Sequence, residues 1–157
     1  MPDTFALATF LPYQLAYISE RVSQRLSQEY SRSHGLSVSE WRVLVNLHSL
    51  GTASVRDIQI FTNLEKSRVS RAVGRLETSG LVQKQTSTED ARLVEIMLSP
   101  KGIETLNAIL PAATEVETNL LKGLTKAQKQ AFFDVLQHFH RVLDDDPDAR
   151  ARFDLPG

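Results

Sequence analysis

Apolar residues recur at intervals of three and four along most of the chain, which is the spacing of amphipathic α-helices. The first such run begins at Leu11 and stops at Gly35, and it predicts a long helix over residues 11–33. The sequence SVSE at 37–40 then has the pattern of a capping box, in which a serine and a glutamate satisfy each other's backbone amides. It predicts a second helix that ends at Gly51.

Two further helices are predicted next. A second capping box, which opens at Ser54, predicts a short helix over 54–61. Thr62 or Asn63 has a side chain suited to capping a helix that runs to Ser79, just before the glycine that ends the pattern. Two helices joined by the turn TNLE have the arrangement of a helix-turn-helix.

The apolar spacing changes from helical to alternating after this helix. The segments LVQKQT at 81–86 and RLVEIML at 92–98 predict two strands, which the polar tip STEDA joins into a β-hairpin. Because the hairpin follows the helix-turn-helix directly, it is placed to act as a wing.

Helical spacing returns for the rest of the chain. Ser99 and Pro100 predict the start of a helix that runs to about residue 122, and Pro111 is expected to bend it because proline lacks a backbone donor. A last helix is predicted over 126–143, after the capping box TKAQ.

This order of elements predicts a mainly α fold with a small β-hairpin (α+β). We expect a central lobe at 36–98, a helical region made of 1–35 and 99–146, and a flexible acidic tail at 147–157. The terminal helices carry more apolar surface than so small a lobe can cover. We therefore expect a homodimer, in which a second copy of the chain covers this surface.

The helix after the turn has two contrasting faces. One is apolar and is expected to pack on the core: Val69, Ala72, Val73 and Leu76. The other carries small residues and three arginines: Ser67, Arg68, Ser70, Arg71, Gly74, Arg75 and Thr78. Glu65 is the one acid three or four residues from any of these arginines, so they lack the pairing usual on a solvated helix. Guanidinium forks beside small residues suit the DNA major groove, whereas an exposed basic helix with no partner is the alternative.

Composition narrows the class of protein less than this helix does. A net charge of -1 neither favours nor excludes nucleic acid, because binding depends on the local field. The chain has no cysteine, which removes disulfides, thiolate metal sites and cysteine nucleophiles. Its N-terminus does not resemble a signal peptide and no apolar run approaches the roughly 20 residues of a membrane helix, so we expect a soluble cytoplasmic protein.

Residues 36–106 resemble the MarR family of dimeric winged-helix transcription regulators. The resemblance lies in EKSRVSRAVGRLETSGLV, in EDAR of the wing, which matches the family's Asp-x-Arg, and in LSPKG, which matches its Leu-Thr-x-x-Gly. It implies a homodimeric DNA-binding regulator, a repressor, that binds a pseudo-palindromic operator with one recognition helix in each half-site.

The resemblance also implies how single residues contact DNA. Arg92 would enter the minor groove while Asp90 holds the wing, and fewer minor-groove contacts are expected because many members have an arginine where Ala91 stands. Ser54 would present backbone amides to a phosphate. The full set of expected DNA contacts is Ser54, Lys66, Ser67, Arg68, Ser70, Arg71, Arg75, Lys84, Asp90 and Arg92.

A second candidate site is a ligand pocket. Trp41 and His48 are seven residues apart on one helix, so both are expected to point toward the first helix with Tyr13, Tyr17 and Arg21. The resemblance implies that small aromatic acids bind where the dimer helices meet the winged lobe, and an aromatic wall with one cation suits such an effector. Core or interface packing is the alternative role for these aromatic residues.

No metal site, cofactor or enzymatic activity is expected. His138 and His140 are two residues apart on a helix, so they point about 200° apart and cannot share one metal ion. No nucleophile-base pair, carboxylate pair or phosphate loop is present in the sequence. The alternative function is a winged-helix adaptor for protein interactions without specific DNA binding, which would carry an acidic or apolar recognition face.

Overall fold

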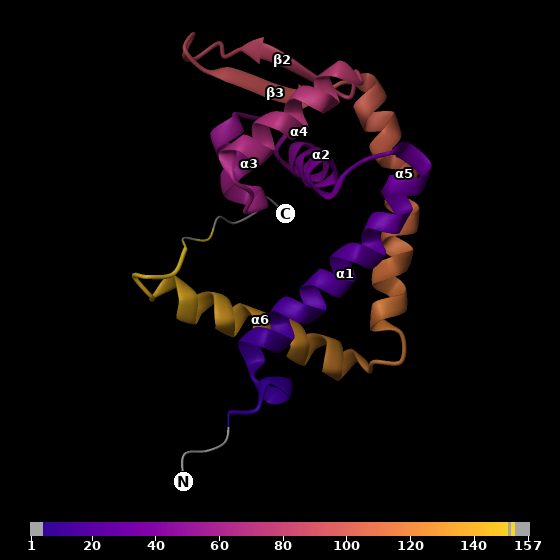
Figure 1. Ribbon diagram of the computed structural model, residues 1–157, viewed down its shortest axis with the longest axis vertical. Helices are drawn as coiled ribbons and strands as arrows, with labels where there is room; N and C mark the ends of the chain where they lie inside the picture. The colour runs from indigo at the N-terminus through magenta and orange to yellow at the C-terminus, as the bar shows by residue number, and fades with distance from the viewer. Residues whose placement is uncertain (1–4, 151, 153–157) are drawn as a thin grey trace.

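Two long helices, α1 (Leu11–His34) and α5 (Pro100–Leu121), lie side by side and carry a small lobe at one end (Figure 1). The computed structural model describes residues 5–150 and 152. A short 3-10 helix, η1 (Leu7–Thr9), precedes α1, and α6 (Lys126–Asp144) runs from the far end of α5 across α1. The predicted tail therefore lies partly outside the described residues, as do residues 1–4 of the predicted helical region.

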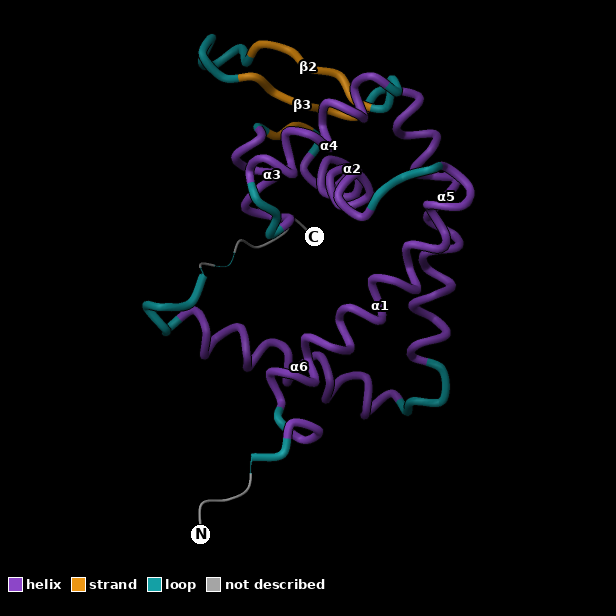
Figure 2. The backbone as a smooth tube through the Cα atoms, viewed as in Figure 1, coloured by secondary structure: helices purple, strands orange, loops and turns teal. Residues whose placement is uncertain are grey.

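The lobe consists of three helices and a small antiparallel sheet (Figure 2). Its helices are α2 (Val38–Leu50), α3 (Val55–Thr62) and α4 (Lys66–Thr78). The sheet has the order β1-β3-β2, from β1 (Thr52–Ala53), β2 (Val82–Thr86) and β3 (Val94–Leu98). The mainly α fold with a β-hairpin is confirmed, and β1 adds a third strand that the sequence pattern did not predict.

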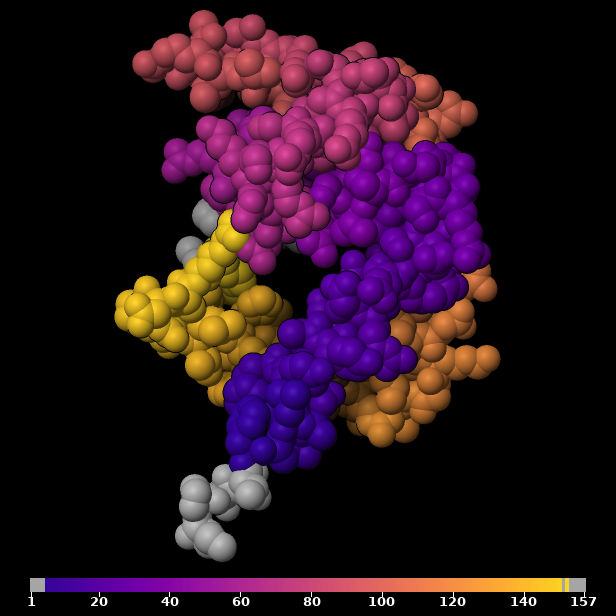
Figure 3. Space-filling model, in the orientation of Figure 1, coloured from indigo at the N-terminus to yellow at the C-terminus, as the bar shows by residue number. Residues whose placement is uncertain are grey.

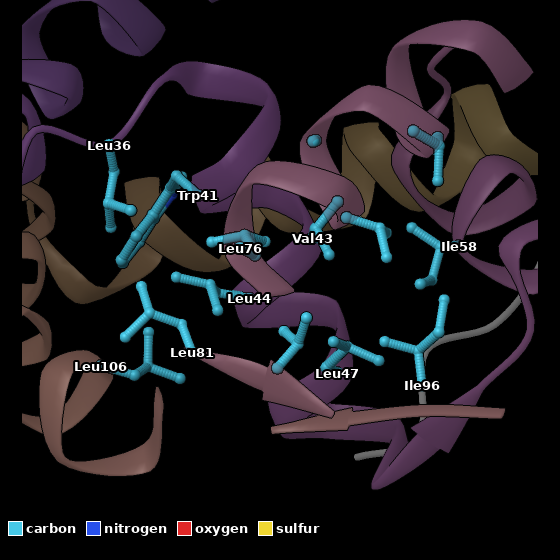
Figure 4. Close-up of a cluster of buried hydrophobic side chains, with 14 of the residues drawn as sticks. Leu36, Trp41, Val43, Leu44, Leu47, Ile58, Leu76, Leu81, Ile96 and Leu106 are labelled. Carbon is cyan, nitrogen blue, oxygen red and sulfur yellow. The ribbon is translucent and has the colours of Figure 1, made fainter. Parts of the chain in front are cut away.

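The buried core lies mainly inside this lobe, between α2, α4 and the sheet (Figure 4). Val43, Leu44 and Leu76 are fully enclosed there, and Ile96 of β3 closes the core from the sheet. Leu106 of α5 joins the same cluster, so the lobe and the long helices share one core.

Local capping explains most helix boundaries. Capping boxes at Ser37, Ser54 and Thr125 begin α2, α3 and α6, and the Ser99 hydroxyl caps α5. These four starts were predicted from the sequence.

The predicted cap of α4 is wrong. Thr62 belongs to α3, where its hydroxyl donates to the Ile58 carbonyl at 2.6 Å. Asn63 ends α3 in the left-handed conformation at φ 56°, which asparagine tolerates better than most residues. Glu65 instead precedes the first turn of α4, without a side-chain capping bond.

Candidate nucleic-acid interface

Helix α4 presents its two predicted faces as expected. Val69, Ala72, Val73 and Leu76 are buried against α2 and α3. The opposite face is exposed along its length: Ser67, Arg68, Ser70, Arg71, Arg75 and Thr78. The turn between α3 and α4 and the burial of one side of α4 together hold the arginines at the surface of the lobe.

The positive charge of these arginines is not compensated by an ion pair within residues 5–150 and 152. None of the ion pairs among the described residues includes Arg68, Arg71 or Arg75. The Arg68 guanidinium donates instead to the hydroxyl of Ser39 in the first turn of α2, at 3.2 Å. Three guanidinium groups on one exposed helix face therefore create a local positive field despite the near-neutral chain.

The start of α3 is less open to a phosphate than the sequence indicated. Both the backbone amide and the hydroxyl of Ser54 donate to the Asp57 carboxylate, at 2.9 and 2.8 Å. An anion is thus already present at this end of α3. The predicted contact of the Ser54 amide with a phosphate stays a prediction, and this geometry does not favour it.

The wing is the β2–β3 hairpin, which extends past α4 at the top of the lobe (Figure 1). At its tip the Arg92 side chain donates to both carboxylate oxygens of Asp90, at 3.2 and 3.3 Å, and the Arg92 amide adds a third bond at 3.0 Å. These bonds hold the pKa of the Asp90 carboxyl below its usual value. Arg92 itself is highly exposed, so a second partner can reach its guanidinium.

Lys84 has a partner that sequence reasoning missed. Its ammonium lies 3.5 Å from the carboxylate of Glu77 near the end of α4. The ion pair links the wing to α4 and partly compensates the charge of Lys84. Lys84 is therefore a weaker candidate for a phosphate contact than Arg92.

An apolar cavity of about 590 Å³ lies where the lobe meets the terminal helices, between α1, α2, α5 and α6. Trp41 forms part of its wall and stacks on the buried Tyr30, with ring centroids 4.9 Å apart. Arg42 supplies a cation at the wall and Glu117 of α5 a carboxylate, and Phe132 and Phe133 line the cavity from α6.

Only Trp41 of the five predicted ligand-pocket residues lines this cavity. Tyr13 and Tyr17 stack on each other on an exposed part of α1, with Arg21 over the ring of Tyr17 at 5.9 Å. His48 is exposed near the end of α2. Sequence reasoning missed Tyr30 and Arg42, although Tyr30 follows Leu26 by four residues and so continues the apolar spacing of α1.

Other kinds of site find no support within residues 5–150 and 152. This part of the chain contains no group of three or more histidine or acidic side chains arranged to hold a metal ion. It likewise contains no helix that is both long and apolar enough to cross a bilayer.

A helix-turn-helix followed by a hairpin, with uncompensated arginines on its second helix, defines the winged helix-turn-helix class of DNA-binding proteins. Residues 34–93 match the family model described as MarR family, and relatives and solved structures that resemble this chain are named as transcriptional regulators. The matched residues contain the helix-turn-helix and most of the hairpin of the described fold.

Individual relatives support the same assignment. The chain is 28% identical over 141 residues to the HTH-type transcriptional repressor IacR of Pseudomonas putida. The aligned region covers 89% of this chain and 84% of IacR. A MarR/EmrR family transcriptional regulator from Acinetobacter sp. ADP1 is similar in structure, with a TM-score of 0.81 and 26% identity over 90% of this chain and all of that one.

A third similarity is with Sco3205 of Streptomyces coelicolor, a MarR family regulator whose structure is of a complex with DNA. The TM-score is 0.77 at 22% identity, and the match covers 99% of this chain and 97% of Sco3205. At that identity the similarity shows the shared fold.

Proposed function

We propose that this protein is a transcriptional regulator of the MarR family, a homodimeric repressor that binds a pseudo-palindromic operator with α4 of each protomer in the major groove and the wing in the adjacent minor groove. The observation that carries the proposal is the row of uncompensated arginines on the exposed face of α4. An adaptor for protein interactions would have no use for this row, because protein partners seldom supply the dense negative charge that matches it. A protein with this function acts in the cytoplasm, where bacterial chromosomal DNA lies.

The homodimer is supported by exposed apolar surface on the terminal helices. Helix α6 buries none of its residues, and large apolar side chains stand exposed along it, among them Phe132, Val135 and Val142. Exposed aromatic and aliphatic side chains also line the N-terminal half of α1. Figure 3 shows an opening bounded by α1, the lobe and the segment after α6.

The apolar cavity supports an effector site. Its volume is in the range of small-molecule sites, and it combines aromatic walls with the guanidinium of Arg42. A small aromatic acid matches this chemistry. Because α2 forms one wall and also belongs to the lobe, a bound effector would change the position of the lobe and so the affinity for DNA, by a coupling typically of about 1–3 kcal/mol.

Fluorescence anisotropy with DNA from upstream of the protein's own gene tests the proposed function. We expect tight binding to this DNA, much weaker binding to a scrambled duplex, and a steep loss of affinity as salt is raised. Equal affinity for both duplexes, or no dependence on salt, would contradict the proposal.

A further inference from the structure

The arginines of α4 lie on one stripe of the helix, and the small residues lie on another. Arg68, Arg71 and Arg75 are three and four residues apart, so at about 100° per residue they fall within roughly 60° of one another. Ser67, Ser70 and Gly74 repeat the same spacing on the neighbouring stripe. Arg71 lies on the edge of the arginine stripe that is nearer to these small residues.

The arginine stripe borders α2. Arg68, Arg71 and Arg75 line a cavity of about 320 Å³ together with Ser37 and Ser39 of the first turn of α2. The hydroxyl of Ser37 is already used in the capping box, where it accepts from the Glu40 amide. The hydroxyl of Ser39 accepts the Arg68 guanidinium and holds it at this side of α4.

Glu40 directly follows Ser39 and lines a neighbouring cavity that shares Arg71 and Arg75 with this one. Its carboxylate accepts the Ser37 amide at 2.8 Å, and Glu40 as a whole is largely buried. Glu40 has no ion pair with an arginine of α4. The cavity therefore keeps a net positive charge and is open to an anion.

We propose that this cavity binds a phosphate of the DNA backbone, that Arg68 and Arg75 hold the phosphate, and that Ser39 is a positioning residue for Arg68. Contact with base edges is left to Arg71 and to the stripe of small residues, which allows the helix to approach the groove closely. The two stripes have different roles because the hydrogen bond to Ser39 holds the Arg68 side chain toward α2. It is thereby turned away from the side of α4 that would face the bases. The inference rests on the proposed DNA binding and names the part of the DNA that each stripe contacts.

Measuring the affinity of three variants for the upstream DNA and for a scrambled duplex tests the assignment. We expect Ser39→Ala to weaken binding to both duplexes by the same factor, about three- to tenfold, because one hydrogen bond that orders a charged group is lost. Arg68→Gln is expected to weaken both equally and more strongly. Ser49→Ala, on the exposed far end of the same α2, is the matched control and is expected to leave both affinities unchanged.

A double-mutant cycle separates positioning from an independent contact. If Ser39 acts through Arg68, then Ser39→Ala costs little affinity once Arg68 is Gln. The same loss in both backgrounds would overturn the positioning role. A loss restricted to the upstream DNA would overturn the assignment of Arg68 to the backbone, because a phosphate contact does not distinguish sequences.

Salt dependence gives a second measurement. Arg75→Gln is expected to reduce the slope of log affinity against log salt by about one for each protomer that contacts DNA, since one phosphate is no longer neutralised. An unchanged slope would overturn the role of Arg75. In contrast, a wild-type protein that fails to bind either duplex would contradict the proposed function itself.

Discussion

Arg71 is the single side chain on which sequence-specific binding should depend most. It is exposed on α4, has no ion pair within the described residues, and borders the stripe of small residues that allows close approach to bases. We expect Arg71→Ala to lower the affinity for the upstream DNA nearly to that for a scrambled duplex, since a bidentate guanine contact contributes about 1–3 kcal/mol and is lost in both half-sites. The mass of the assembly, measured by light scattering, should not change. Arg32→Ala on α1 is the control, and a loss of similar size in that variant would argue for a nonspecific effect of charge.

Asp90 determines how the wing presents Arg92. Because the hydrogen bonds from Arg92 lower the pKa of the Asp90 carboxyl in the folded protein, the ion pair stabilises the folded wing at pH values above the ordinary aspartate pKa of 3.8. This contribution is lost only as the pH falls through the lowered folded-state pKa. An NMR titration of the carboxyl carbon should therefore show a midpoint below 3.8. Asp90→Asn should weaken DNA binding several-fold at neutral pH, whereas a midpoint at or above the ordinary value would show that the ion pair does not persist in solution.

At the scale of elements, Gly102 is where α5 is joined to the lobe. A Cβ atom added there would lie 2.0 Å from the Leu81 carbonyl oxygen, which is backbone and cannot move without shifting the strand. We expect Gly102→Ala to lower the melting temperature by at least about 5 °C, since overpacking of this kind costs roughly 1–3 kcal/mol or more. Gly74→Ala is the matched control, because no atom lies within 4 Å of its added Cβ and alanine favours the helix. If the Gly102→Ala protein has the same melting temperature as the wild type at equal concentration, then close packing of α5 on the lobe at Gly102 is refuted.

The elements that the sequence predicted well are those with local signals. Each capping box involves residues three apart, so the starts of α2, α3 and α6 could be found without tertiary information. Strand β1 could not, because its two residues are strands only through pairing with Met97 and Ile96, some 45 positions away. The stacking of Tyr30 on Trp41 likewise depends on how α1 packs on α2, and the Lys84–Glu77 pair depends on how β2 lies against α4. The arginine face was predictable because helical spacing alone places it, whereas the Ser39 contact brings together residues 29 apart.

At the scale of the whole molecule, the chain separates its two kinds of surface. Helix α4 and the wing occupy one end of the molecule, and α6 and the N-terminal half of α1 occupy the other (Figure 1). Most of the exposed large apolar side chains lie on α1 and α6, although Leu93 and Val94 are exposed in the wing. Operators with two half-sites require two recognition helices held at a fixed spacing of about one helical turn of DNA. The proposed dimerisation through the terminal helices would meet both needs, because it would cover the apolar surface and fix the distance between the two copies of α4.

Val135 of α6 provides the test of this arrangement. It is 47% exposed, and Val142 continues the same apolar side of the helix one heptad later. A carboxylate at position 135 would be buried without a partner in each protomer of the dimer, so we expect Val135→Asp to raise the dimer dissociation constant by more than about 100-fold. Analytical ultracentrifugation should show a monomer with the helix content of the wild type, and affinity for the upstream DNA should fall with the loss of the second half-site. Gln137→Asp introduces the same charge two residues later, about 200° around the helix, and should leave the dimer intact. If both variants stay dimeric, the interface lies elsewhere on the chain.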